Sequence, residues 1–285
     1  MGMPVAVELL AILFLVTGLA GAWVCPACGS EASGDFCGSC GLPRVPEGMA
    51  FVPACSVTVN GETVHVPAFF VDRDPVTCRD LLDWLGAELH SLDQVTMYLT
   101  GQDELIMSGE VFQEDFSGVY FVRYTPWVIY VDETGKVGGV NVQNGCFDLP
   151  AAALTFAAAD LYLQDTGKRL PTEAELVAAV SGGTVGAEDA WDVMEKYTDF
   201  LSLTISSVVG IPPSRLAMFG GNASPEERVM WEWTREPWGG ESVTSNSPYA
   251  LIVKPLDPPV RGTALRENGY FNVIFRGVVP LPWYQ

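Results

Sequence analysis

Hydrophobic and polar residues follow three successive patterns along the chain. Residues 4–24 are almost entirely apolar, and no charged residue occurs from Leu9 to Val24. Residues 25–44 are rich in Gly, Ser and Cys, whereas residues 45–285 mix alternating, strand-like runs with helix-like runs. The chain is therefore expected to contain an apolar N-terminal segment, a small cysteine-rich unit and one large domain.

The apolar segment, residues 1–24, has two interpretations. At about 1.5 Å of helix rise per residue, its apolar run can cross the ~30 Å hydrocarbon layer of a membrane as one helix. A secretory signal peptide is the alternative, because Ala20, Gly21 and Ala22 resemble a cleavage site. A signal peptide has Lys or Arg before its apolar run, and here neither residue precedes the run. Trp23 also stands at the end of the run, where interfacial tryptophans of transmembrane helices occur. We therefore favour a retained, single-pass transmembrane helix.

The remainder, residues 45–285, contains signals for both strands and helices. Residues 56–59 and 63–66 alternate on either side of Asn60-Gly61, a dipeptide typical of tight hairpins. Further strands are expected at residues 67–76, 119–124, 127–131, 137–142 and 270–279, and helices at residues 78–89, 150–164 and 173–180. This mixture predicts an α+β fold with much irregular loop.

The best-marked helix start lies in the stretch KRLPTEAELVAAV, residues 168–180. Thr172 is the expected N-cap, and Glu175 stands at the third helical position, which is the capping-box spacing. Leu176 and Val180 then begin an apolar face at helical spacing. This pattern alone predicts a helix and indicates nothing about function.

The charge of the chain restricts its partners. Its 15 Lys and Arg residues against 35 Asp and Glu give a net charge of −20 at pH 7. A surface so poor in basic side chains cannot neutralise several phosphates, so we expect no nucleic-acid partner. A basic partner or a bound cation remains compatible with this charge, as does a plain solvated acidic surface.

The strongest chemical signal is the spacing of Cys25, Cys28, Cys37 and Cys40, which reads C-x2-C-x8-C-x2-C. Two CxxC turns, each followed by Gly, can place four thiolates around one tetrahedral ion, as in a zinc ribbon. Rubredoxin-like iron uses the same ligands, and two disulfides are the alternative in an exported segment. Zinc is the favoured interpretation. Because cysteine fills all four positions, we expect a structural role, with the metal holding together residues 25–44.

Several segments of the large domain occur in an order that resembles a known family. They are PAFFVDRDPVTCRDLLDWL, LPAAALTFAAADLYLQDTGKRLPTEAELVAAVSGG, MWEWTREPW, the pair Arg261-Gly262 and NVIFRGVV. Together these blocks resemble the formylglycine-generating enzyme family, also called sulfatase-modifying factor domains, over about residues 48–280. The resemblance implies a C-type-lectin-like variant fold with little regular secondary structure.

The departures from that family bear on catalysis. Active copper-dependent members use two cysteines late in the domain, whereas this chain has no cysteine after Cys146. Phe275, in the final FR pair, follows Gly262 by only 13 residues, so the segment that carries those cysteines is missing. The iron-dependent ergothioneine-synthase relatives use histidines, but here only His65 and His90 occur, outside such a motif. The resemblance thus implies a non-catalytic member.

Calcium is a further candidate ligand, since domains of this family often bind it. The carboxylates that could serve are those of Asp72, Asp74, Asp189, Asp192 and Glu195. Carboxylate oxygens suit this hard cation, although solvated surface acids have the same pattern.

Three further cysteines, Cys55, Cys78 and Cys146, stand alone in the sequence. Single cysteines of this kind are typically small apolar residues of the core. If the domain is exported, a disulfide between two of them is the alternative.

These observations predict a membrane-anchored, non-enzymatic subunit of a larger membrane complex, with residues 25–44 as a metal-bound joint. Protein subunits of that complex and the membrane itself are the expected partners. Arg44 is the only basic residue near the apolar run, which leans the following domain towards the cytoplasm. One alternative is a ligand- or glycan-binding module that uses residues 182–228. The other is an oxidoreductase of the formylglycine-generating type.

Overall fold

The computed structural model of the chain describes residues 22–88, 110–113, 120–124, 127–131, 137–142, 145–152, 154–187, 229–237, 248–256, 258–267, 273–281 and 284. They form two compact units, one ending at Arg44 and one spanning Val45–Gln285. Among these residues no helix is long and apolar enough to span a membrane. The predicted transmembrane segment, residues 1–24, lies outside them apart from its last three residues. Of these, Trp23 and Val24 form a strand, so the prediction that the helix extends to Val24 is wrong.

The first unit contains one short antiparallel pair, β1 (Trp23–Val24) and β2 (Glu31–Ala32). Trp23 pairs with Ala32 and Val24 with Glu31. We refer to residues 22–44 as the cysteine ribbon, because its remaining length consists of turns around the four cysteines.

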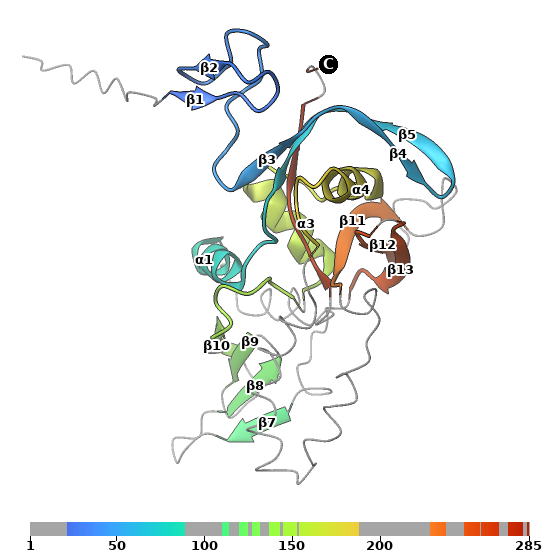
Figure 1. The fold of residues 1–285 in the computed structure, drawn as a ribbon. Helices are drawn as coiled ribbons and strands as arrows, with labels where there is room; N and C mark the ends of the chain where they lie inside the picture. Colours follow the sequence, from blue (N-terminus) through green and yellow to red (C-terminus); the bar gives the residue numbers. More distant parts are fainter. Residues whose placement is uncertain are drawn as a thin grey trace, which may run out of the picture. The chain divides into compact units, whose positions relative to one another are not determined.

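A three-stranded sheet joins the two ends of the second unit. Its order is β15-β6-β3, with β3 (Met49–Val52), β6 (Phe69–Asp72) and β15 (Val278–Pro280). Both pairings are antiparallel, and Val71 of β6 pairs with Ala50 on one side and Val278 on the other. All four residues of β6 are buried, as expected for a central strand that reads FFVD. In Figure 1 these strands run side by side through the middle of the unit.

The predicted hairpin is confirmed as β4 (Cys55–Val59) and β5 (Glu62–Val66). Asn60 has φ of 57° and Gly61 of 79°, the left-handed pair that a two-residue type I′ turn needs. The hairpin arches over α4 (Glu173–Ser181) in Figure 1. Half-buried side chains of β4 pack there against buried alanines of that helix.

The next sheet is a meander of consecutive antiparallel strands in the order β10-β9-β8-β7. They are β7 (Glu110–Gln113), β8 (Tyr120–Tyr124), β9 (Trp127–Val131) and β10 (Val137–Val142). The last three confirm the strands predicted from alternation. Fully buried Trp127 fixes β9 to the domain by donating from Nε1 to the Ala152 carbonyl at 2.8 Å.

The C-terminal half contributes a sheet in the order β13-β12-β11-β14. Its strands are β11 (Trp231–Pro237), β12 (Tyr249–Lys254), β13 (Val260–Leu265) and β14 (Val273–Ile274). Only β14 runs parallel to its neighbour, β11. Since β14 immediately precedes the final turn into β15, this sheet and the three-stranded sheet are linked through a few residues.

Three helices are described: α1 (Cys78–Glu88), α3 (Phe156–Asp165) and α4. The prediction that the second begins at Pro150 is wrong, because α3 begins only after its N-cap, Thr155. Pro150 instead forms an antiparallel bridge with Thr77, and the next amide donates to the Val76 carbonyl at 2.7 Å. Pairing with the chain before α1 therefore keeps these residues extended.

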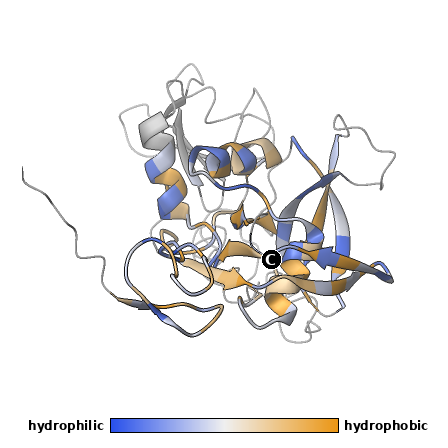
Figure 2. Ribbon diagram, turned by 90° about the horizontal axis from the view of Figure 1, so that it is seen from above, coloured by the Kyte–Doolittle hydropathy of each residue, from blue (hydrophilic) through white to orange (hydrophobic). Residues whose placement is uncertain are grey.

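The main core lies among α1, α3 and the sheet that contains β11. Tyr162 of α3 meets Phe275 edge to face with ring centroids 5.9 Å apart, and Phe156 meets Trp233 in the same way at 5.9 Å. A second buried cluster joins the three-stranded sheet to α4. Figure 2 shows apolar residues, in orange, concentrated in these strands and helices. The α+β class is confirmed for the second unit.

Candidate functional site

The first pair of cysteines in the ribbon is held by a tight backbone turn. The amide of Cys25 donates to the Ser30 carbonyl at 2.9 Å, and the amide of Gly29 donates to the Cys25 carbonyl at 2.8 Å. Gly29 has φ of 72°, a conformation that residues with a side chain rarely adopt. The glycine after the CxxC pair is therefore needed to close the turn over Cys28.

The second pair repeats this turn twelve residues later. The amide of Cys37 donates to the Leu42 carbonyl at 2.8 Å, and the amide of Gly41 donates to the Cys37 carbonyl at 2.8 Å. Gly41 has φ of 77°. Cys40 corresponds to Cys28, so the four sulfurs are supplied by two equivalent turns.

The turns bring all four cysteine sulfurs within 4.8 Å of one another. Cys25 Sγ lies 3.5 Å from Cys40 Sγ, and Cys28 Sγ lies 3.6 Å from Cys37 Sγ. Four sulfurs at Zn–S distances of about 2.3 Å would be about 3.8 Å apart in a tetrahedron. The geometry can bind a metal such as zinc, and none of the four cysteines forms the disulfides of the alternative interpretation.

Burial and hydrogen bonding divide these thiols into inner and outer ligands. Cys25 and Cys37 are buried, whereas Cys28 is exposed and Cys40 is half-buried. Burial raises the pKa of the Cys25 thiol to about 11, because a thiolate inside the ribbon is poorly solvated. The hydrogen bonds of Ser30 lower the pKa of Cys28 to about 6. A divalent cation would stabilise the inner thiolates that water cannot reach.

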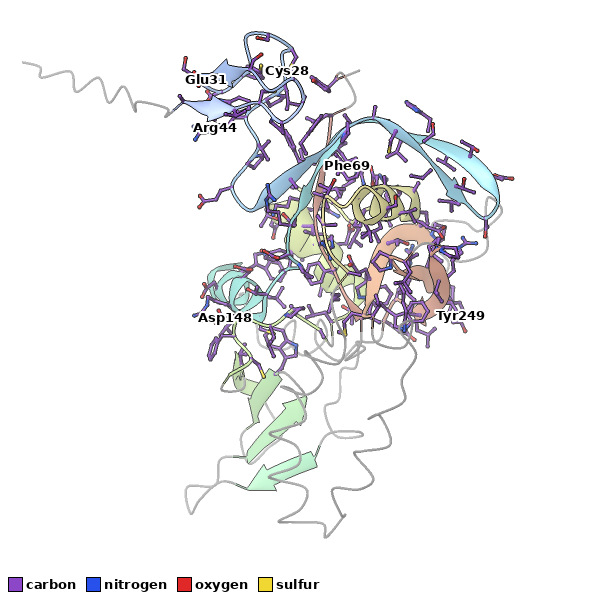
Figure 3. All side chains as sticks on the ribbon, viewed as in Figure 1. Cys28, Glu31, Arg44, Phe69, Asp148 and Tyr249 are labelled. Carbon is purple, nitrogen blue, oxygen red and sulfur yellow. The ribbon has the colours of Figure 1, made fainter. Side chains whose placement is uncertain are left out.

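The remaining contacts of the ribbon are few. Trp23 donates from Nε1 to the Gly34 carbonyl at 2.8 Å, and the amide of Arg44 donates to the Asp35 carbonyl at 2.7 Å. Its buried hydrophobic residues are Cys25, Ala32, Cys37 and Leu42. Figure 3 marks Cys28, Glu31 and Arg44 on this unit. Since half of so small a core is cysteine, the ribbon depends on what the cysteines bind.

The second unit contains a set of four ion pairs, which we call the ion-pair frame. The pairs are Asp72–Lys168, Arg169–Glu175, Glu173–Arg261 and Glu232–Arg276. Every one of these residues belongs to the sequence blocks quoted above, and each pair except Arg169–Glu175 joins two different blocks.

Asp72 illustrates why these acids are structural. One of its oxygens accepts from Lys168 Nζ at 2.7 Å, and the other accepts from the Gly277 amide at 2.8 Å. Both oxygens are thus occupied beside an ammonium group, which disfavours the calcium ion considered for Asp72. The contacts instead fix β6 to the turn between β14 and β15.

The Glu232–Arg276 pair is the most deeply buried of the four, with both side chains at most 1% exposed. The guanidinium donates to both carboxylate oxygens of Glu232 at 2.8 Å. It also donates to the carbonyls of Arg73 and Gly186 at 3.2 Å. One arginine therefore ties β11, the end of β6 and the segment after α4 together.

The start of α4 confirms the predicted capping box. Thr172 accepts from the Glu175 amide at 3.1 Å, and the Glu175 carboxylate accepts from the Thr172 amide at 2.8 Å. Arg169 also donates to both oxygens of Glu175. Burial alone would raise the pKa of Glu175, but the hydrogen bonds from Arg169 and Thr172 bring it below its ordinary value.

Glu173, two residues earlier, has the opposite balance. Burial raises its pKa, and the nearby Arg261, 3.0 Å away, offsets this only in part. The Glu173 amide donates to both carboxylate oxygens of Glu236, whose pKa burial also raises. The N-terminus of α4 thus holds two carboxyls that resist ionisation next to one that favours it.

The remaining calcium candidates and the two histidines are either exposed or outside the described residues. Asp74 is exposed, whereas Asp189, Asp192 and Glu195 lie outside the described residues, as does His90. His65 is exposed on β5. Within the described part of the chain, the ribbon cysteines are the one group of His, Cys, Asp or Glu able to hold a metal ion.

The three lone cysteines, Cys55, Cys78 and Cys146, form no disulfide. Cys78 and Cys146 are buried in the main core, as expected for small apolar residues, and Cys55 is half-buried on β4. Burial raises the pKa of Cys146 to about 11 and also raises that of Cys55. These thiols are therefore protonated at neutral pH, which makes them poor nucleophiles.

Sequence reasoning missed the ion-pair frame. Lys168 was not singled out at all, and Asp72 was interpreted as a calcium candidate. The available signal was charge inside apolar runs, since Asp72 follows Phe-Phe-Val and Arg276 follows Val-Ile-Phe. A charge in such surroundings is expected to be buried and paired.

Comparison with protein families gives a match over the first part of the second unit. A family model described as "Sulfatase-modifying factor enzyme 1-like domain" matches residues 44–207, more than half of the 285 residues. The match starts one residue before the second unit and includes Asp72, Lys168 and the α4 capping box. No curated protein matches the chain.

Proposed function

The chain belongs to the sulfatase-modifying factor enzyme 1-like family, and on this premise we propose that it is a non-catalytic, membrane-anchored subunit of a larger membrane complex. In this proposal residues 45–285 form a lectin-like scaffold for contacts with other protein subunits. The cysteine ribbon binds zinc and acts as the joint between that scaffold and the membrane segment.

The observation that carries the proposal is the ion-pair frame. The eight charged residues of the frame all come from the sequence blocks that resemble the family, and they are paired with one another. Three of the pairs join different blocks, and the fourth holds the capping box of α4. A domain that retains this frame keeps its shape whether or not it performs chemistry.

The region where the family resemblance places reactive cysteines supports the same conclusion. Arg261 pairs with Glu173, and a Cβ on Gly262 would come within 2.9 Å of the Trp231 ring. The Arg-Gly block thus serves packing between β13 and β11. No cysteine follows Cys146 in the sequence, so the two thiolates that the resemblance implies for copper chemistry are not supplied.

The membrane part of the proposal is supported by the sequence. Residues 4–24 have the length and the apolar character of a single span, and the ribbon begins within their last three residues, with β1 at Trp23. With Arg44 as the only basic residue near the span, the scaffold is proposed to face the cytoplasm.

The first test is to solubilise native membranes with a mild detergent and to identify what migrates with the chain on a native gel. A stoichiometric set of membrane proteins is expected. The matched control is a chain with Arg276→Met, in which the scaffold is destabilised while the ribbon and apolar segment remain. Loss of the partners from this variant would assign the contacts to the scaffold.

A chain that migrates as a free monomer would contradict the proposal and point to a surface-binding module instead. The enzymatic alternative has its own test. Incubation with Cu⁺, oxygen and a cysteine-containing sulfatase peptide is expected to leave the cysteine unchanged, as judged by mass spectrometry. Conversion of that cysteine to formylglycine would show that the domain is an enzyme.

A further inference from the structure

Two apolar side chains of the cysteine ribbon stand out in solvent. Val24 is 65% exposed and Phe36 is 62% exposed, more than any other large hydrophobic residue among those described. In the second unit the corresponding extremes are Tyr249 at 44% and Val64 at 36%. The ribbon, a unit of 23 residues (22–44), thus exposes two large apolar side chains although it buries very few hydrophobic residues.

Val24 and Phe36 occupy equivalent places in the two cysteine turns. Each directly precedes the first cysteine of its pair, Cys25 or Cys37. The sulfurs of these two cysteines lie within 4.8 Å of each other. The repeated turn therefore places both apolar residues next to the metal-binding centre, one from each half of the ribbon.

A second contact brings Phe36 close to the point where the apolar segment enters the ribbon. Trp23 Nε1 donates to the Gly34 carbonyl at 2.8 Å. Phe36 is two residues from Gly34, which an extended chain spans in about 7 Å. Phe36 is therefore held within a short distance of the Trp23 side chain.

Only a short length of chain separates the end of the apolar segment from Val24. The strand β1 already begins at Trp23, so any helix formed by the preceding apolar residues must end before it. Val24 lies at most about 7 Å of chain from residue 22. The headgroup region of a bilayer is about 5–7 Å thick on each side. A span that ends at residue 21 or 22 thus places Val24 in that region.

We propose that Val24 and Phe36 insert into the headgroup–acyl boundary of the bilayer that holds the apolar segment, so that the ribbon lies on the lipid surface. This inference rests on the membrane anchor proposed above. Large apolar and aromatic side chains favour this boundary. Apart from its cysteines the ribbon has few charged side chains to oppose insertion, since Glu31, Asp35 and Arg44 are its only Asp, Glu, Lys or Arg residues. The occupant is a zwitterionic lipid surface, because a chain with net charge −20 gains nothing from anionic lipid.

The test uses the full chain in phosphatidylcholine vesicles with the photoreactive residue p-benzoylphenylalanine introduced in place of Phe36. Irradiation is expected to give a protein adduct heavier by one phosphatidylcholine molecule. The same replacement of Val24 is expected to give the same adduct. Replacement of Val64, an exposed apolar residue of β5, is the matched control and is expected to give at least tenfold less.

The zinc content per chain shows whether each variant retains a folded ribbon. If the variant at one of the two positions, Phe36 or Val24, loses its zinc, lipid labelling by the variant at the other position still tests the proposal. Washing the vesicles with alkaline carbonate separates this inference from the anchor. If the chain resists the wash but neither Phe36 nor Val24 labels lipid above the Val64 control, the ribbon does not lie on the bilayer, and the anchor stands. If the wash releases the chain, the anchor itself is wrong, and this inference falls with it.

Discussion

The cysteine ribbon and the second unit differ in what stabilises their folded state. The ribbon buries four hydrophobic residues, two of which are cysteines. The second unit buries extensive apolar clusters and adds the ion-pair frame, in which three of the four pairs join distant segments. In the proposed function the ribbon obtains its order from a metal bound by the four cysteines, whereas the second unit obtains it from packing and from charges paired within the fold.

This difference makes the two units separately vulnerable. Agents that act on thiolates or metal should disorder the ribbon and spare the second unit. Changes in the ion-pair frame should do the reverse. Four predictions follow from the contrast, in order of decreasing effect.

The largest effect is expected from Cys37→Ser, which removes a buried sulfur of the quartet. Structural zinc sites supply about 10–16 kcal/mol of folding free energy to small units, so a site reduced to three sulfurs should lose both the metal and the fold of the ribbon. Elemental analysis should show less than one metal ion per chain, and proteolysis should cleave within residues 22–44.

The control for this change is Ser39→Ala, at an exposed position in the same turn. It should keep the metal. The midpoint of thermal unfolding of the second unit should be the same in both variants. A large shift of that midpoint on loss of metal would contradict the separation of the two units.

The second effect concerns the buried pair Glu232–Arg276. Arg276→Met leaves a carboxylate without its partner inside the core, and should lower the free energy of unfolding of the second unit by about 3–5 kcal/mol. Chemical denaturation measures this change. The metal content should stay at the wild-type value.

The double variant Arg276→Met with Glu232→Leu sharpens this prediction. Replacing both charges by apolar residues removes the desolvation cost of the lone carboxylate, so most of the lost stability should return. If the double variant is as unstable as Arg276→Met alone, the hydrogen bonds of the guanidinium to backbone carbonyls outweigh its charge pairing.

The third effect comes from steric crowding at the same frame. A Cβ on Gly277 would come within 2.6 Å of Lys168 Cδ and 2.9 Å of Asp72 Oδ2. Gly277→Ala should therefore destabilise the second unit by about 1–3 kcal/mol, the usual cost of overpacking. Gly38→Ala in the ribbon is the matched control, since nothing lies within 4 Å of its Cβ. Equal stability of the two variants would show that the frame tolerates displacement of Lys168.

The smallest effect is a difference between Glu175 and Glu173 of α4 in how their contributions to stability depend on pH. The pKa of Glu175 is lowered in the folded state, so its ionised form stabilises the fold above its ordinary pKa near 4.5, and this contribution is lost as the pH falls through the lowered value. The pKa of Glu173 is raised, so its ionised form opposes folding at neutral pH, and this cost disappears as the pH falls.

Glu175→Gln should therefore cost about 1 kcal/mol at pH 7, similar to a lost hydrogen bond, and less in acid. Glu173→Gln should change stability little at pH 7. Thermal unfolding at pH 7 and pH 4 checks both variants. If Glu173→Gln is the more damaging change at pH 7, the Arg261 ion pair outweighs the burial of Glu173.

Features set by neighbouring residues could be predicted from the sequence. Asn60-Gly61 requires two left-handed residues in a row, and Thr172 with Glu175 closes a cap within four residues, so each signal is complete in a short window. The cysteine quartet was found for the same reason, because each CxxCG turn determines its own backbone. The sequence also predicted the core roles of Cys78 and Cys146.

Features that depend on distant residues could not be predicted. Lys168 pairs with Asp72 across a sequence separation of 96 residues, and Arg276 pairs with Glu232 across a separation of 44 residues. The sequence predicts a helix from Pro150, but the stretch after it is extended, because its pairing with Val76 and Thr77 leaves no signal in the local pattern. The family resemblance indicated which blocks belong together, but not that their charges neutralise one another.

The order of strands in the sheet β15-β6-β3 has a consequence for synthesis. The strand β6 receives its first neighbour, β3, from residues made just before it, but its second neighbour is β15, which ends at Pro280. The ribosome adds about 5–20 residues per second, so roughly 10–40 s separate β6 from β15. During that interval the edge of β6 that will receive β15 is open to other strands, whereas both cysteine turns have already been translated. If the four cysteines bind zinc as proposed, the ribbon can take up that ion and reach its final form on the nascent chain, well before the domain behind it closes.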